Sequence, residues 1–151
     1  MANNNPNVIM NDLANVLTGT PGMVSLQTER RRPLDRFAIP SILPAVFIYQ
    51  EGLEAVRPGL PSAVADYILS VGIDILDEAA TEQTALLTDG GIRAEVLERI
   101  RNNPRLSNPT VYLMHDGPHE DPVYDIEKDR AFVTIPLKFG FQFRDSVVIP
   151  P

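Results

Sequence analysis

The sequence of 151 residues contains no cysteine, and this absence excludes disulfides, thiolate catalysis and cysteine-ligated metal sites. It also lacks any run of about 18 apolar residues, so it predicts no membrane-spanning helix. The first seven residues, MANNNPN, have neither a basic flank nor an apolar stretch, and we expect no signal peptide. We therefore expect expression inside a cell and no membrane partner.

Basic residues are fewer than acidic ones, which gives a formal net charge of -7 and a pI of about 4.7. An acidic chain is repelled by nucleic acid and by anionic lipid at long range. The charges are segregated along the chain: residues 29–37 hold four arginines against two acids, and residues 115–130 hold six acids against two basic residues. Such segregation is typical of complementary surfaces on neighbouring copies of one chain, and it also occurs where charge serves only solubility.

Length and a hydrophobic content of 44% predict one domain with one core. We expect a disordered N-terminus over residues 1–7, where asparagine predominates, and a single domain over residues 8–151. Fourteen prolines, many of them in pairs, mark the boundaries of regular structure.

Hydrophobic periodicity then predicts the elements of this domain. Helical spacing begins at Pro6 and ends before Gly19, and a second helix begins after Asp89 and ends before Pro104. Residues 51–62 are rich in turn-forming residues and predict a connection. Strands are expected at 45–50, 65–76, 110–114 and 131–144, with a further strand and then an extended arm within residues 22–42. The order predicts an α+β fold: a mixed or antiparallel β-sheet with two α-helices packed on one face.

The clearest pattern is the last one, RAFVTIPLKFGFQF, in which apolar residues alternate with mostly polar ones. Such alternation is typical of an antiparallel strand with one solvated face. Pro136 lacks an N–H group, so we expect one side of this strand to be an edge there. Gly140 predicts a bend or a bulge.

The candidate chemistry is sparse. His115 and His119 stand four residues apart among Asp116, Glu120 and Asp121, but the intervening Gly-Pro excludes a helix, which leaves a loop metal site or an exposed acidic loop. The stretch TDGGIR is either an anion-binding helix start or a turn and cap. Asp74 interrupts an apolar strand, and we expect it to face solvent or a partner. Without a nucleophile motif or an acid–base pair, the sequence predicts no enzyme and no metal site.

The stretch RRRPLDRF, residues 30–37, allows three interpretations: a solvated loop, an arm that forms salt bridges to a neighbouring subunit, or a DNA contact. It has one aromatic residue, Phe37, which argues against a single-strand stacking platform, and it follows no major-groove helix pattern.

The stretches RRRPLDRFAIPSILPAVFIYQEG, YILSVGIDIL, IRAEVLERIRNNPRL and RAFVTIPLKFGFQF resemble the tail terminator (tail completion) proteins of long-tailed bacteriophages. In that family a short helix precedes an LPAV strand that is followed by one or two acidic residues, which Leu43–Val46 and Glu51 match. A long alternating strand, a helix and a final alternating strand follow, so the resemblance covers residues 8–144. The length of the arm over residues 23–44 and the acidic loop over 115–122 depart from the pattern.

This resemblance implies a structural virion protein, made in the host cytoplasm and located in the tail or neck. It forms a homo-hexameric ring that caps the tail tube, stops tube polymerisation and joins the tail to the head-side connector or neck protein, and it contacts the sheath protein in contractile tails. DNA passes through the lumen without sequence-specific binding. A head-tail connector or stopper protein is the main alternative, and a small metal-dependent enzyme is another. The residues expected at the interfaces between subunits or with partners are Arg30, Arg31, Arg32, Asp35, Arg36, Glu51, Asp116, Glu120 and Asp121.

Overall fold

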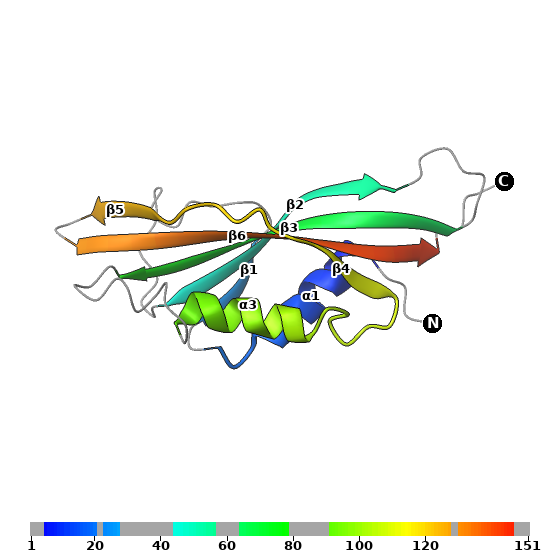
Figure 1. The fold of residues 1–151 in the computed structure, drawn as a ribbon, viewed down its shortest axis with the longest axis horizontal. Coiled ribbons are helices and arrows are strands. Elements are labelled where there is room, and N and C mark those ends of the chain that lie inside the picture. Colours follow the sequence, from blue (N-terminus) through cyan, green and yellow to red (C-terminus); the bar gives the residue numbers. More distant parts are fainter. Residues whose placement is uncertain are drawn as a thin grey trace.

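The computed structural model of the protein describes residues 5–20, 23–27, 44–56, 64–78, 91–127 and 130–146. These residues form one α+β domain with two helices and six strands in one sheet, as predicted (Figure 1). In chain order the elements are α1 (Pro6–Leu17), β1 (Met23–Gln27), β2 (Ala45–Ala55), β3 (Val64–Glu78), α3 (Ile92–Asn102), β4 (Val111–Asp116), β5 (Val123–Glu127) and β6 (Arg130–Ser146). Within the described part of the chain, no helix is both long and apolar enough to cross a membrane.

The sheet is mixed, and its strand order is β1-β2-β3-β6-β4, with β5 also paired to β6. β1 runs parallel to β2, whereas every other pair is antiparallel. β3 pairs with β6 along its whole length, from Val64 opposite Ser146 to Glu78 opposite Phe132. At about 3.3 Å per residue, the 17 residues of β6 extend over roughly 55 Å, so β3 and β6 run the length of the molecule (Figure 1).

Both helices pack on one face of this sheet and lie on the same side of it in Figure 1, as the sequence predicts. The reason is the alternation of β3 and β6, which directs one set of apolar side chains to that face. The helices contribute apolar stripes at helical spacing. The core joins Ile9, Leu13 and Leu17 of α1, Ile92, Val96 and Ile100 of α3, and Leu69, Val71, Ile73, Ile135, Leu137, Phe139 and Phe141 of the sheet.

Helix α1 begins earlier than the boundary we predicted for the domain. Asn5 caps the helix because its side-chain oxygen accepts a hydrogen bond from the Val8 N–H at 3.0 Å, and Pro6 occupies the first turn, where no N–H partner is needed. Residues 5–7, which we placed in the disordered N-terminus, therefore form the cap and first turn of α1. Gly19 follows the helix with a φ of 101°, a conformation that favours glycine.

The edge predicted at Pro136 is confirmed. β5 pairs with β6 only up to Thr134, and β4 pairs with it only from Phe139 onward, so no described strand lies beside residues 135–138 on that side. The N–H and C=O of Lys138 both point to this gap, and alternation of the backbone directs the nitrogen of Pro136 to the same side. Pro136, which has no N–H group, therefore lies where no described neighbouring strand requires a hydrogen-bond donor.

The strands differ from the sequence-based expectations at three places. β2 does not end at Gln50; it continues to Ala55 after an irregularity between Gln50 and Gly52. β5 was not predicted at all. The bulge expected at Gly140 lies instead in the opposite strand, where the register shifts between Leu113 and His115.

The second face of β6, which points away from the two helices, is less exposed to solvent than the alternation of apolar and polar residues predicts. Phe132 and Thr134, which lie on this face, are 0% and 9% exposed, whereas Arg144 at the far end is exposed. The alternation correctly separates the two faces, but it does not reveal that the N-terminal part of the second face is also buried.

Candidate functional site

The structure does not bring the predicted interface residues together in one place. Arg30, Arg31, Arg32, Asp35 and Arg36 lie outside the described residues. Glu51 is on β2, whereas Asp116 ends β4 and Glu120 and Asp121 follow it, so β3 and β6 separate the two groups. Their role at interfaces stays a prediction.

The acidic loop between β4 and β5, residues 117–122, lies against the gap in the edge of β6. The Gly117 N–H donates to the Lys138 carbonyl at 2.9 Å, and the Lys138 N–H donates to Nδ1 of His119 at 3.1 Å. The Lys138 ammonium forms an ion pair with Glu120 at 2.9 Å. The loop therefore satisfies the backbone of Lys138 as a paired strand would.

Asp116 connects this loop to helix α3. Arg101 of α3 donates hydrogen bonds to both carboxylate oxygens, and one of these, Oδ1, also lies 2.8 Å from Nε2 of His119. The hydrogen bond from Arg101 and the contact with His119 outweigh partial burial and hold the pKa of Asp116 below its ordinary value. Asp116 and Glu120 therefore each have a cationic partner within the chain, which sequence reasoning did not foresee.

We expect Asp116 to stabilise the fold at neutral pH and to lose this effect in acid. Its pKa is lower in the folded state than in the unfolded state, so its contribution is present above the unfolded pKa of about 3.9 and is lost as the pH falls through the folded value. Asp116→Asn is expected to unfold at a lower urea concentration than the unchanged protein at pH 6. The difference between the two is expected to shrink below pH ~4. A difference in the urea concentration of unfolding that is as large below pH ~4 as at pH 6 would contradict this expectation.

The two histidines do not form the loop metal site considered from the sequence. Both ring nitrogens of His119 already have partners, and the His115 ring lies over Gly140, where a Cβ would come within 2.9 Å of it. Within the described residues, no group of three or more His, Cys, Asp or Glu side chains is placed to hold a metal ion.

Helix α3 does not begin directly after Asp89, as the sequence predicted. Gly91 is the N-cap residue and makes no side-chain capping bond, and the helix begins at Ile92. Asp89 and Gly90 lie outside the described residues.

A buried polar cluster on the second face of the sheet was missed from the sequence. Asp74, which we expected to face solvent or a partner, is 1% exposed. The Tyr49 hydroxyl lies 3.5 Å from Asp74 and 3.4 Å from Glu51, and the Tyr49 ring lies over Gly72. The glycine leaves room for the ring, because a Cβ at that position would overlap it. The only local signal was the Gly-x-Asp spacing of residues 72–74 in a strand otherwise rich in apolar residues.

The exposed apolar surface follows the periphery of the sheet. Among the residues that the structure describes, seven large apolar side chains are about two-fifths to one-half exposed: Leu26, Leu53, Val56, Tyr112, Met114, Val123 and Tyr124. They belong to β1, β2 and its end, β4 and β5, and none belongs to the described side chains of β3 or β6. A shallow groove of about 370 Å³ beside Tyr112 is lined by Gln142, Phe143 and the ion pair of Asp66 with Arg144.

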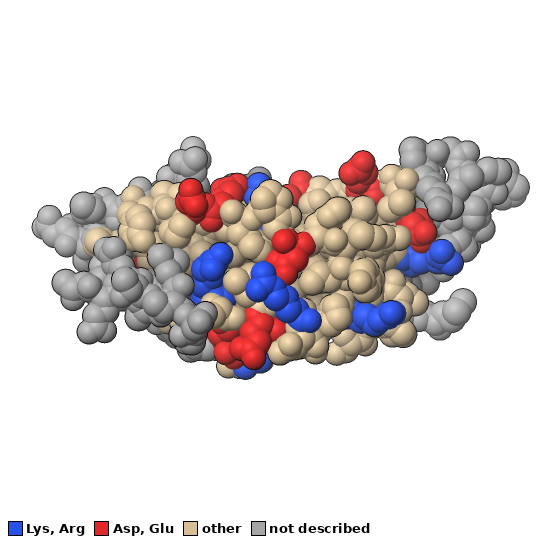
Figure 2. Space-filling view, in the orientation of Figure 1, with Lys and Arg blue, Asp and Glu red and all other residues tan. Residues whose placement is uncertain are grey.

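The charged side chains on the face seen in Figure 2 are mixed in sign. Basic groups lie next to acidic groups there, and the described residues form no large patch of one sign on this face (Figure 2). Among the described residues, Arg99 forms an ion pair with Glu95 and Arg101 forms one with Asp116. Two acids of the acidic segment 115–130, Asp116 and Glu120, are paired with cations of the chain.

No model of a known protein family matches this chain, and no curated protein sequence matches it either.

Proposed function

We propose that this chain is the subunit of a homo-hexameric ring that caps the tail tube of a long-tailed bacteriophage. The ring stops tube polymerisation, joins the tail to the head-side connector and lets DNA pass. What supports the proposal is the resemblance of residues 8–144 to tail terminator proteins, together with the order of the elements. A short helix, a strand that begins at Ala45, the long strand β3, the helix α3 and the final long strand β6 follow one another as in that family. The proposal includes no catalysis and no cofactor.

The observation that carries the proposal furthest is the position of the exposed apolar side chains. All seven belong to β1, to β2 and its end, to β4 or to β5, and none lies among the described side chains of β3 and β6. Strand edges with exposed apolar residues favour association with other chains. The exposed apolar residues lie toward both edges of the sheet, on β1 and β2 toward one edge and on β4 and β5 at the other. Each subunit therefore has two different apolar surfaces, one at each edge. Two different surfaces on one chain are what a closed ring of head-to-tail contacts requires.

The capping activity is tested by polymerising purified tail tube protein with and without this chain. A terminator at a low molar ratio is expected to shorten the tubes, because each bound ring stops growth at one end. A connector or stopper protein is expected to leave tube length unchanged and to bind portal-side proteins. Unchanged tube length would therefore contradict the proposal.

The arginine stretch is expected to contribute to assembly through contacts with acids on the next subunit or on a tube or connector protein. Replacing Arg30, Arg31 and Arg32 together by alanine is expected to weaken ring formation, measured by light scattering after size-exclusion chromatography at increasing protein concentration. The matched control replaces the same three residues by lysine, which keeps the charge, and circular dichroism verifies that both variants are folded. If the alanine variant assembles at the same protein concentration as the unchanged protein, the three arginines do not contribute to the interface.

A further inference from the structure

His119 lies between two partners that determine where its ring carries a proton. The backbone N–H of Lys138 lies 3.1 Å from Nδ1 and can only donate, so Nδ1 must offer its lone pair. Nε2 lies 2.8 Å from Oδ1 of Asp116, which accepts. The neutral imidazole therefore carries its hydrogen on Nε2. The side chain is only 13% exposed, so water does not easily replace either partner.

Charged groups from every neighbouring element face this ring or its partners. Arg101 of α3 donates to both oxygens of Asp116, including the Oδ1 that faces the ring, and on β6 the Lys138 ammonium is paired with Glu120 of the loop. His115 of β4 packs over Gly140, one strand position beyond Phe139, whose ring lies 5.1 Å from that of His119. The cations near His119 are thus paired with carboxylates, and the carboxylate that faces the ring itself is Asp116.

We propose that His119 is a pH-sensitive latch that holds the loop of residues 117–122 on the open edge of β6. Uptake of a proton from water places a second N–H on Nδ1, and this N–H then faces the N–H of Lys138. Two donors cannot form a hydrogen bond, so the contact with β6 breaks. The imidazolium is at the same time drawn more strongly to Asp116. The ring therefore stays with β4 and leaves β6.

Release of the latch changes what β6 presents to its surroundings. Between Thr134 and Phe139 the outer side of β6 has no described strand beside it, and the loop satisfies Lys138 there. When His119 leaves, the Lys138 N–H loses the acceptor that lies 3.1 Å from it at this sheet edge, and exposed strand edges pair with other chains. The latch thus couples protonation of one side chain to the opening of a short edge in the middle of the longest strand. It does not depend on the proposed function.

The chain has only two histidines, which makes a direct test possible. Ring nitrogen shifts of His115 and His119 and the hydrogen-exchange protection of the Lys138 amide are measured by NMR from pH 8 to pH 5. At pH 8 we expect His119 to carry its proton on Nε2. As the ring becomes protonated, we expect the protection factor of the Lys138 amide, corrected for the intrinsic pH dependence of exchange, to fall about tenfold with the same midpoint.

Two variants separate the latch from other effects of pH. His119→Gln keeps an acceptor near Lys138 but does not titrate, so Lys138 protection is expected to lose its pH dependence. His115→Gln removes the other histidine and is expected to keep the full effect. A proton on Nδ1 at pH 8, or Lys138 protection that is constant while His119 titrates in the unchanged protein, would overturn the proposal whether or not either variant folds.

Discussion

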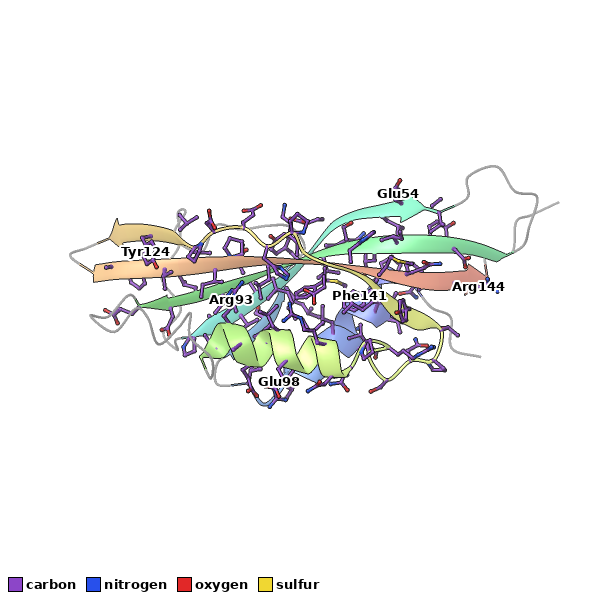
Figure 3. All side chains as sticks on the ribbon, in the orientation of Figure 1. Glu54, Arg93, Glu98, Tyr124, Phe141 and Arg144 are labelled. Carbon is purple, nitrogen blue, oxygen red and sulfur yellow. The ribbon has the colours of Figure 1, made fainter. Side chains whose placement is uncertain are left out.

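Replacement of Phe141 by alanine is expected to lower the free energy of unfolding by about 3–5 kcal/mol. Phe141 is 0% exposed and lies on the helix-covered face of β6, opposite Leu69 of β3 on one side and Leu113 of β4 on the other (Figure 3). Removing the ring loses apolar burial and leaves a cavity that long, doubly paired strands cannot easily close. Since small domains are stable by only about 5–15 kcal/mol, this variant is expected to be close to unfolded at physiological temperature.

The measurement is urea unfolding followed by circular dichroism, with Tyr124→Ala as the matched aromatic control. Tyr124 lies on the peripheral strand β5 and is 49% exposed (Figure 3). Its replacement is expected to cost about 1 kcal/mol or less, because much of the ring is already in contact with water. Losses of equal size in the two variants would mean that Phe141 does not lie in the core.

Replacement of Gly72 by alanine is expected to destabilise the protein by about 1–3 kcal/mol, although alanine adds only one methyl group. The nearest atoms to that methyl group belong to the Tyr49 ring, which is 1% exposed and has little room to move. Any displacement of the ring also separates its hydroxyl from Asp74 and Glu51. The expected loss therefore combines overpacking with weakened polar contacts.

Gly52→Ala provides the control for the change of glycine to alanine in this sheet. Gly52 lies on the neighbouring strand β2, and nothing lies within 4 Å of a Cβ at that position. Its replacement is expected to be neutral or to stabilise by up to about 1 kcal/mol, because alanine restricts the unfolded chain. Thermal unfolding of both variants checks the pair, and a Gly72→Ala variant as stable as Gly52→Ala would show that the Tyr49 ring does not lie over Gly72.

Patterns that depend on the local chain predicted much of this fold. The alternation around Phe141 identified β6 and its core face, because successive side chains of a strand point to opposite faces whatever they pack against. The missing N–H of Pro136 located an open edge for an equally local reason. Pro6 and the apolar stripe after it predicted α1 almost to the residue. Two helices on one face of a mixed sheet then followed from the order of the elements.

Features that depend on distant partners were not predictable in this way. Asp74 is buried on the second face of the sheet, where it contacts the hydroxyl of Tyr49, a residue 25 positions away in the chain. The role of His119 depends on a backbone N–H 19 residues further along the chain, in a gap that only the pairing of β4 and β5 defines. β5 was missed because its five residues lie directly after an acidic, proline-containing loop and carry no long alternation of their own.

Negative-stain electron microscopy of the purified chain mixed with tail tubes from the same source tests the central claim most directly. We expect six-fold rings seated as caps at one end of the tubes. Rings that bind portal-side proteins and not tubes would establish a connector instead. Small single particles that do not bind the tubes would contradict the proposed function.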